Sequence, residues 1–241
     1  MPTNRREFLS DVARAAGLVF VGCGVTDAAA PRGQRATGPR RTVAINGRRI
    51  RTVDIHAHCA VSKANDLLRR PPANPSGVLG PLVLEGSPLA ERIAAMDAQG
   101  IDIAVLSINP NWYDVERDLA AEVISVQNEA MAAFCASHTD RFAALGSVAL
   151  QFPDLAASQL EHGMKRMGFR GVAIGGSVAG AELSSVTFHP FWAKAEELGA
   201  VVFIHPQAST SAELNARLKG NGMLTNVIGN PLSRRRSRSR I

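Results

Sequence analysis

Short apolar segments alternate with longer amphipathic ones along the chain from residue 43 onward. The apolar runs have the length of buried strands, and the segments between them have helical spacing, often with Pro in the first turn or Gly after the last. The predicted strands are Thr52–His56, Ile101–Ser107, Phe142–Val148, Gly171–Gly175 and Val201–His205, and the predicted helices are Pro88–Gln99, Asp114–Ser137, Pro153–Met167 and Pro190–Leu198. Strict alternation of strand and helix predicts an α/β fold with a parallel sheet buried on both faces.

A hairpin is predicted just before the first of these strands. The dipeptide Asn46-Gly47 stands between two short β-type runs that begin at Val43 and end at Ile50. Asn-Gly is a strong signal for a two-residue hairpin turn because both residues tolerate a positive φ. We therefore expect the chain to enter its first main strand from a small antiparallel ribbon.

Size and composition limit the class of protein. A chain of 241 residues with 46% hydrophobic residues is enough for one principal domain, and no apolar run approaches the length of a membrane span. Residues 1–51 hold ten Arg against three acidic residues and residues 232–241 hold five Arg and no acid, so the formal charge of +6 comes from the two ends around an acidic body. Basic ends on an acidic body do not indicate a nucleic-acid partner.

The first 30 residues are predicted to be a targeting segment. Arg5-Arg6, followed by Phe8-Leu9 and a modestly apolar stretch, resembles a twin-arginine export signal; an amphipathic basic helix is the alternative. A degenerate lipoprotein box ends at Cys23, and Ala28-Ala29-Ala30 offers a signal-peptidase site, so both a periplasmic protein and one lipid-anchored at Cys23 remain open. Residues 31–41, rich in Pro, Gly and Arg, are expected to be a linker.

The last ten residues have a composition unlike that of the body. Residues 232–241 are almost entirely Arg and Ser and directly follow Gly229-Asn230-Pro231. A basic patch for anionic partners is one interpretation, and out-of-frame translation that begins near Leu232 is the one we favour. On that basis the folded domain is expected to cover residues 42–231.

Three histidines are placed for metal binding. His56 and His58 are two residues apart at the end of the first strand, so alternation turns both imidazoles to one side. His205 closes the fifth strand, which lies across the mouth from the first in a closed (β/α)8 barrel of the TIM type. The three side chains are then predicted to share one ion, most readily Zn²⁺, with Fe, Mn or Co as alternatives. Solvated or mutually bonded histidines are the competing interpretation.

Several motifs together resemble one branch of the amidohydrolase superfamily. That branch contains aminocarboxymuconate-semialdehyde decarboxylase and related metal-dependent decarboxylases, also called amidohydrolase 2. The motifs are Val53-Asp54-Ile55-His56-Ala57-His58, Asn128-Glu129, Arg141-Phe142-Ala143-Ala144-Leu145-Gly146-Ser147-Val148, Gly168-Phe169-Arg170-Gly171-Val172, Phe191-Trp192 with Ala195-Glu196-Glu197-Leu198-Gly199, and Val202-Phe203-Ile204-His205-Pro206. The resemblance implies a (β/α)8 barrel and decarboxylation of an aromatic or unsaturated small-molecule carboxylic acid.

The resemblance also implies a ligand set. The metal would be held by His56, His58 and His205 with an Asp from the last barrel strand, and a further His would manage the proton that replaces CO₂. No match to that late His or that Asp is found, so the catalytic residues stay unassigned and a barrel truncated after about five βα units is expected. A metal-dependent hydrolase of an ester, lactone or amide and a catalytically incomplete fragment remain as alternatives. A second copy of the chain is a candidate partner for such an open barrel.

Three residues after the second strand are candidates for substrate contact. Asn109, Trp112 and Tyr113 follow the predicted strand Ile101–Ser107, whose carboxyl end lies on the metal side of a barrel. The two aromatic side chains offer apolar faces to a ring. An ordinary packing role is the alternative for all three.

Overall fold

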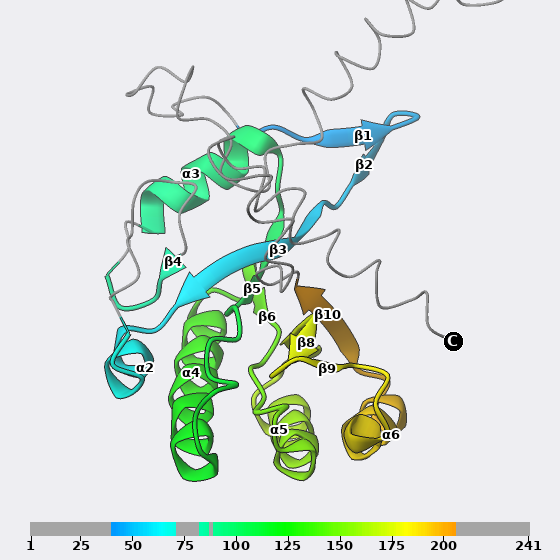
Figure 1. Ribbon diagram of the computed structural model, residues 1–241. Helices are drawn as coiled ribbons and strands as arrows, with labels where there is room; N and C mark the ends of the chain where they lie inside the picture. Colours follow the sequence, from blue (N-terminus) through cyan, green and yellow to red (C-terminus); the bar gives the residue numbers. More distant parts are fainter. Residues whose placement is uncertain (1–39, 71–81, 87–88, 206–241) are drawn as a thin grey trace, which may run out of the picture.

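The computed structural model describes residues 40–70, 82–86 and 89–205 (Figure 1). The predicted targeting segment, with Arg5, Arg6 and Cys23, the basic tail 232–241 and nearly all of the linker 31–41 lie outside the described residues. Of the linker, Arg40 and Arg41 are described, and the Arg41 N–H donates a hydrogen bond to the Asp97 carbonyl at 2.9 Å. Among the described helices, none combines the length and hydropathy needed to cross a membrane.

Strands and helices alternate through the described chain. The strands are β1 (Val43–Ile45), β2 (Arg48–Ile50), β3 (Val53–Ala60), β4 (Leu82–Val83), β5 (Ile103–Ser107), β6 (Phe142–Ala144), β7 (Gly171–Gly175), β8 (Ser177–Val178), β9 (Ala181–Glu182) and β10 (Val201–His205). The helices are α2 (Ser62–Leu67), α3 (Leu89–Gln99), α4 (Arg117–Ser137), α5 (Pro153–Arg166), the 3₁₀ turn η1 (Val186–Phe188) and α6 (His189–Glu197).

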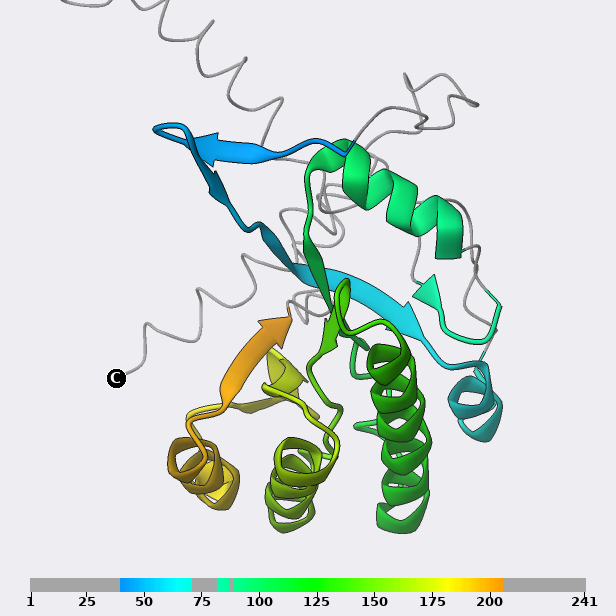
Figure 2. The same ribbon diagram turned by 180° about the vertical axis from the view of Figure 1, so that it is seen from behind.

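The five main strands form a curved parallel sheet in chain order. One ladder runs β4-β3-β5-β6 and a second pairs β7 with β10, and a parallel bridge between Gly146 and Val172 joins them. Helices α4, α5 and α6 lie side by side along the outer face of this sheet, as both views show (Figures 1 and 2). Successive neighbours in one parallel sheet with helices outside are the arrangement of a (β/α) barrel. The sequence prediction of a parallel α/β sheet is confirmed over these strands.

The predicted hairpin is confirmed, and the conformation of its turn explains why Asn46-Gly47 stands at this position. Strands β1 and β2 pair antiparallel, with Ile45 opposite Arg48. Asn46 and Gly47 between them have φ of 51° and 75°. Two successive positive φ values define the type I′ turn, whose twist matches that of the flanking strands.

The predicted strand Phe142–Val148 was too long. β6 ends at Ala144, and by Ser147 the Asn128 side chain of α4 is the hydrogen-bond partner of the backbone. The Asn128 amide donates to the Ser147 carbonyl at 3.0 Å, and its oxygen accepts from the Ser147 N–H at 2.8 Å. The start of α4 was also predicted too early: the Glu116 carboxylate accepts hydrogen bonds from the backbone of Asp118 and Leu119 and so fixes the first turn.

The core consists of two apolar clusters on the helical side of the sheet. The first packs α4 and the neighbouring helices against β3, β5 and β6, and Leu106, Trp112 and Met131 are fully buried in it. The second lies between β7 and helices α5 and α6, around Leu160 and Phe191. These clusters hold the strands rigidly, so the side chains at the strand ends have fixed positions.

A close contact at Gly171 lets β7 and β10 pair. Gly171 has φ of 152° and lies opposite Val201, and a Cβ on Gly171 would come within 1.8 Å of the Val201 carbonyl oxygen. Only glycine fits such an approach of two backbones. The neighbouring Phe169 ring fills the space beside Gly146 and Gly163, where an added Cβ would lie 2.7 and 2.9 Å from it. Gly171 thus determines how closely β10, and with it His205, approaches the sheet.

Ionic contacts fasten the opposite, amino-terminal edge of the sheet. Asp102, which is buried, accepts hydrogen bonds from the Arg40 guanidinium at 2.6 Å and from the backbone N–H of Thr52 at 2.8 Å. Arg49 of β2 makes a further ion pair with the same carboxylate. Asp102 therefore ties the hairpin and the start of β3 to the start of β5.

Candidate metal centre

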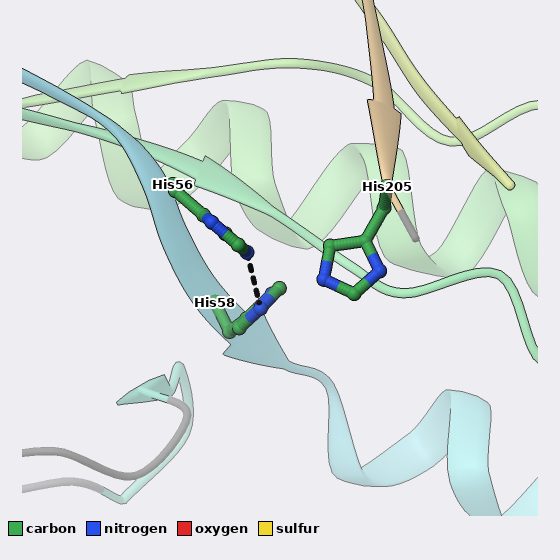
Figure 3. A group of neighbouring side chains, drawn as sticks. All are labelled: His56, His58 and His205. Atoms are coloured by element: carbon green, nitrogen blue, oxygen red, sulfur yellow. Dashed lines mark hydrogen bonds between the residues drawn. The ribbon is translucent and has the colours of Figure 1, made fainter. Parts of the chain in front are cut away.

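Three histidines from the first and the last of the five main strands come together. His56 and His58 lie on β3 and His205 is the last residue of β10, and their rings point toward one another (Figure 3). One ring nitrogen from each lies within 4.8 Å of those of the other two. The ring centroids are 4.7 Å apart for His56 and His58, 5.1 Å for His56 and His205, and 4.9 Å for His58 and His205. The sequence predicted this convergence of side chains from strands separated by more than a hundred residues.

The geometry of the cluster fits a cation-binding site. All three imidazoles are half-buried, and the Phe203 ring lies 5.3 Å from that of His56. The Nε2 atoms of His56 and His58 are 3.0 Å apart. Three nitrogen donors at these separations match the donor set of a divalent ion, and small side-chain rotations bring all three within reach of one ion.

Burial lowers the pKa of His58 and so favours its neutral form. Burial, and to a smaller extent the nearby His56, lower the pKa of His58 from 6.5 to about 4, against the opposing effect of the Asp54 carboxylate. His58 is therefore neutral near pH 7, which is the state of imidazole that binds a metal ion.

The strand pairings explain why the imidazoles meet. His58 lies opposite Ser107 at the carboxyl end of β5, and His205 lies opposite Gly175 at the carboxyl end of β7. All three histidines are thus at the same edge of the sheet. Reactive groups of (β/α) barrels gather at this edge.

The three candidate substrate residues lie in different environments. Asn109 is exposed just beyond the end of β5. Trp112 is fully buried, and its indole N–H donates to the Val148 carbonyl at 3.0 Å, so the packing role accounts for its position and leaves no exposed surface for a ligand. Gln151 holds the same loop by donating to the Trp112 carbonyl at 2.7 Å.

Tyr113 is the candidate that bonds the strand paired with β10. Its hydroxyl oxygen accepts a hydrogen bond from the Gly175 N–H at 3.1 Å, and Gly175 is the residue paired with His205. Burial raises the pKa of Tyr113, so the phenol stays protonated and can donate its own proton. Among the three candidates, the structure brings Tyr113 closest to the ladder that carries His205.

Sequence reasoning missed two charged residues near the site. Asp54 accepts a hydrogen bond from the His56 N–H through Oδ1 at 3.0 Å, and the half-buried Arg92 of α3 is close enough to affect the pKa of His58. Asp54 belongs to the same short motif as the two histidines, which was an available signal. Arg92 follows in a helix after a long connection, and nothing in the local sequence pointed to it.

Within the described residues, the cluster contains histidines alone. The family resemblance implies an Asp from a later strand, and that expectation falls outside the part of the chain described. Asp54 is the carboxylate nearest in sequence, and it is not a member of the cluster.

Comparisons with known proteins agree with this architecture. Gamma-resorcylate decarboxylase from Rhizobium radiobacter is 30% identical over 124 residues, which are 48% of this chain and 38% of that protein. 2-Amino-3-carboxymuconate-6-semialdehyde decarboxylase from Dictyostelium discoideum is 31% identical over 117 residues, 48% of this chain and 33% of that protein. The aligned parts thus span well under half of each relative.

A solved structure shows the same fold. The structure of 5-carboxyvanillate decarboxylase from Novosphingobium aromaticivorans with bound manganese matches with a TM-score of 0.58 and 24% identity, over 83% of this chain and 60% of that one. The parallel sheet with outer helices is therefore part of a TIM-type barrel. Residues 53–223 match the family model Amidohydro_2, described as amidohydrolase, and this range includes all three histidines. The chain belongs to the amidohydrolase family, in the amidohydrolase 2 branch.

Proposed function

We propose that this protein is a metal-dependent decarboxylase of an aromatic or unsaturated carboxylic acid. The main support for this function is that His56, His58 and His205 converge at the carboxyl edge of the sheet in a chain of this family. The similarity to gamma-resorcylate and aminocarboxymuconate-semialdehyde decarboxylases supports the reaction class. Because the chain spans only part of those relatives, activity and substrate are proposed on this combined basis.

The proposed cofactor is one divalent ion held by the three imidazoles. Imidazole nitrogen is a good ligand for Zn²⁺, which the sequence favours, and also for Mn²⁺, the metal named for the structurally similar decarboxylase. When bound, such an ion supplies a Lewis-acidic site for a carboxylate or a neighbouring oxygen of the substrate. A direct comparison of Zn²⁺, Mn²⁺ and Co²⁺ decides which one the site prefers.

The protein's own groups have separate tasks in this proposal. The three histidines would hold the ion, and the burial of His58 lowers its pKa and so favours the neutral imidazole that binds a metal. Tyr113, protonated and fixed to Gly175, donates its phenolic proton to an oxygen of the bound acid. Asn109, exposed at the end of β5, is the second proposed polar contact. The reaction breaks the bond between the carboxylate carbon and its neighbour, releases CO₂ and places a proton on the remaining carbon.

The experiment is a substrate panel with the full chain, purified after expression in metal-supplemented medium. 2,6-Dihydroxybenzoate, 5-carboxyvanillate and aminocarboxymuconate semialdehyde are each incubated with protein loaded with Zn²⁺ or Mn²⁺, and CO₂ is measured. Release of CO₂ from one of these acids by the wild type, and none by His205→Ala, supports the proposal. Metal-loaded protein that hydrolyses an ester or lactone panel and releases no CO₂ contradicts it in favour of the hydrolase alternative.

Export and assembly extend the proposal. Arg5-Arg6 support transport of the folded protein by the twin-arginine route, and replacing both by Lys is expected to keep the protein inside the cell. A homodimer is the proposed assembly of the chain. Light scattering on the purified chain gives twice the monomer mass if this is correct and the monomer mass if it is wrong.

A further inference from the structure

Strand β3 does not alternate regularly along its length. Asp54 pairs with Ala104 of β5, whereas Ala57 pairs with Leu106, so three steps along β3 match two steps along β5. One extra residue in β3 is the signature of a β-bulge, which bends a strand and turns side chains. The bulge lies between Asp54 and Ala57, so His56 is within it and His58 follows it.

The bulge places Asp54 and His58 on opposite faces of the sheet. Paired residues of a parallel ladder share a face, and Ala104 and Leu106 are two residues apart, so Asp54 and Ala57 face the same way. That is the helical side, because Ala57, Ala104 and Leu106 all belong to the core cluster there. His58 follows Ala57 and therefore faces the other side, where the imidazoles meet.

Asp54 holds the bulged segment through its side chain. Its Oδ1 accepts a hydrogen bond from the backbone N–H of His56 at 3.0 Å. This bond fixes the peptide that precedes His56 and so restricts the direction in which the His56 Cα–Cβ bond points. A carboxylate that bonds the backbone two residues further along is a common local restraint.

Arg92 of α3 is close enough to the Asp54 carboxylate for the two charges to interact. Arg92 is half-buried, and the charge of Asp54 raises its pKa against the larger lowering effect of burial. Asp54 and Arg92 also act on the pKa of His58 with opposite signs, which shows that both charges lie near the histidines.

We propose that Asp54, accompanied by Arg92, is a positioning residue for the metal centre: its bond to the His56 N–H maintains the bulge that turns both β3 imidazoles toward His205. This inference rests on the proposed metal site. In this proposal Asp54 does not contact the metal. It orients the histidine ligands before the ion binds. Groups that orient the ligands of a metal typically change its affinity 10- to 100-fold when they are removed.

The test measures metal affinity directly. The full-length wild type, Asp54→Ala and Asp54→Asn are titrated with Co²⁺ by calorimetry, and the visible absorption of the bound Co²⁺ is recorded. Asp54→Ala is expected to raise the Kd for Co²⁺ at least about tenfold and to change the absorption spectrum. Asp54→Asn keeps an oxygen acceptor of the same length and is expected to stay within about threefold of the wild type.

Glu116→Ala is the matched control. Glu116 also accepts backbone hydrogen bonds, from Asp118 and Leu119, but at the start of α4 and not in the strand that carries the histidines. It is expected to lower thermal stability and leave the Kd and the spectrum unchanged. If Asp54→Ala does not fold, Asp54→Glu takes its place, because the added methylene displaces the acceptor while the charge remains; its Kd is also expected to rise about tenfold.

The outcomes separate the two proposals. Folded Asp54→Ala or Asp54→Glu with the wild-type Kd and spectrum overturns the positioning role and leaves the metal site standing. An equal loss of affinity in Glu116→Ala also overturns it, because general destabilisation would then explain the effect. A wild type that binds no Co²⁺, Zn²⁺ or Mn²⁺ refutes the proposed function itself.

Discussion

The Nε2 atoms of His56 and His58 lie 3.0 Å apart, within hydrogen-bonding distance of each other. Two unprotonated nitrogens repel at that separation, so one proton or one cation must lie between their lone pairs. Burial disfavours a charged His58, so one proton shared by the two neutral rings accounts for the distance, and the same two nitrogens would hold a divalent ion. The path of β3 thus already brings the two side-chain nitrogens close to each other.

Replacing Gly171 by Ala is expected to separate β10 from β7. A Cβ would lie 1.8 Å from the Val201 carbonyl oxygen, a contact that only a backbone shift can relieve. The expected loss is more than about 3 kcal/mol of unfolding free energy, measured by urea denaturation, together with weaker metal binding as His205 moves. Gly86→Ala is the control, since an added Cβ there meets no atom within 4 Å. Equal stability of the two variants would contradict the account of this ladder.

Asn128→Ala is expected to destabilise the region where β6 ends. The buried amide makes one donor and one acceptor bond to Ser147, and both backbone groups lose their partner when it is removed. The cost is roughly 2–4 kcal/mol of unfolding free energy. Glu129→Ala, which removes an exposed bond to Ser125 one residue later in the same helix, should cost far less. Hydrogen exchange at the Ser147 amide should quicken in Asn128→Ala and not in Glu129→Ala.

Acid is expected to weaken the amino-terminal edge of the sheet through Asp102. The hydrogen bond from the Thr52 backbone and the Arg49 and Arg40 guanidinium groups lower the pKa of Asp102, although burial opposes them. A carboxyl whose pKa is lower in the folded than in the unfolded state stabilises the fold above its unfolded pKa and loses that contribution as the pH falls.

The test compares unfolding free energies of the wild type and Asp102→Asn between pH 7 and pH 3. The wild type should lose stability below about pH 4, the range where an unfolded Asp takes up its proton, and the variant should lose less over the same range. The variant should also be the less stable of the two at pH 7. Parallel pH profiles would show that Asp102 does not contribute in this way.

Tyr113→Phe separates substrate binding from metal binding. The variant loses the phenolic donor and the acceptor for the Gly175 N–H, while the ring packing remains. On an acid that the wild type turns over, kcat/KM is expected to fall about tenfold, the effect of one lost hydrogen bond in the transition state. The Kd for the metal should not change. An unchanged kcat/KM would limit Tyr113 to its structural bond with Gly175.

Much of the fold follows from local pattern. Strands β7 and β10 were predicted with their exact bounds, because each is a five-residue apolar run with a sharp boundary, Gly171 and Gly175 in one case and His205 before Pro206 in the other. The convergence of the three histidines also followed, since strand order in a parallel barrel fixes which carboxyl ends meet.

What sequence reasoning missed depends on long-range contacts. The backbone of Ser147 is bonded by the Asn128 side chain of the preceding helix α4, and no pattern within residues 142–148 shows this. The bulge between Asp54 and Ala57 is seen only in the register of β3 against β5 and has no signal in the sequence of β3. Trp112 was open to either role until its indole was found bonded to Val148 inside the core.

The most direct test of the central claim is metal stoichiometry. The wild type and the variants His56→Ala, His58→Ala and His205→Ala are purified after expression in metal-supplemented medium, and bound metal is measured by elemental analysis with circular dichroism as the check on folding. The account predicts about one divalent ion per chain in the wild type and little or none in each folded variant. A wild type without bound metal, or folded variants that all keep a full ion, would contradict the assignment of His56, His58 and His205 as a metal centre.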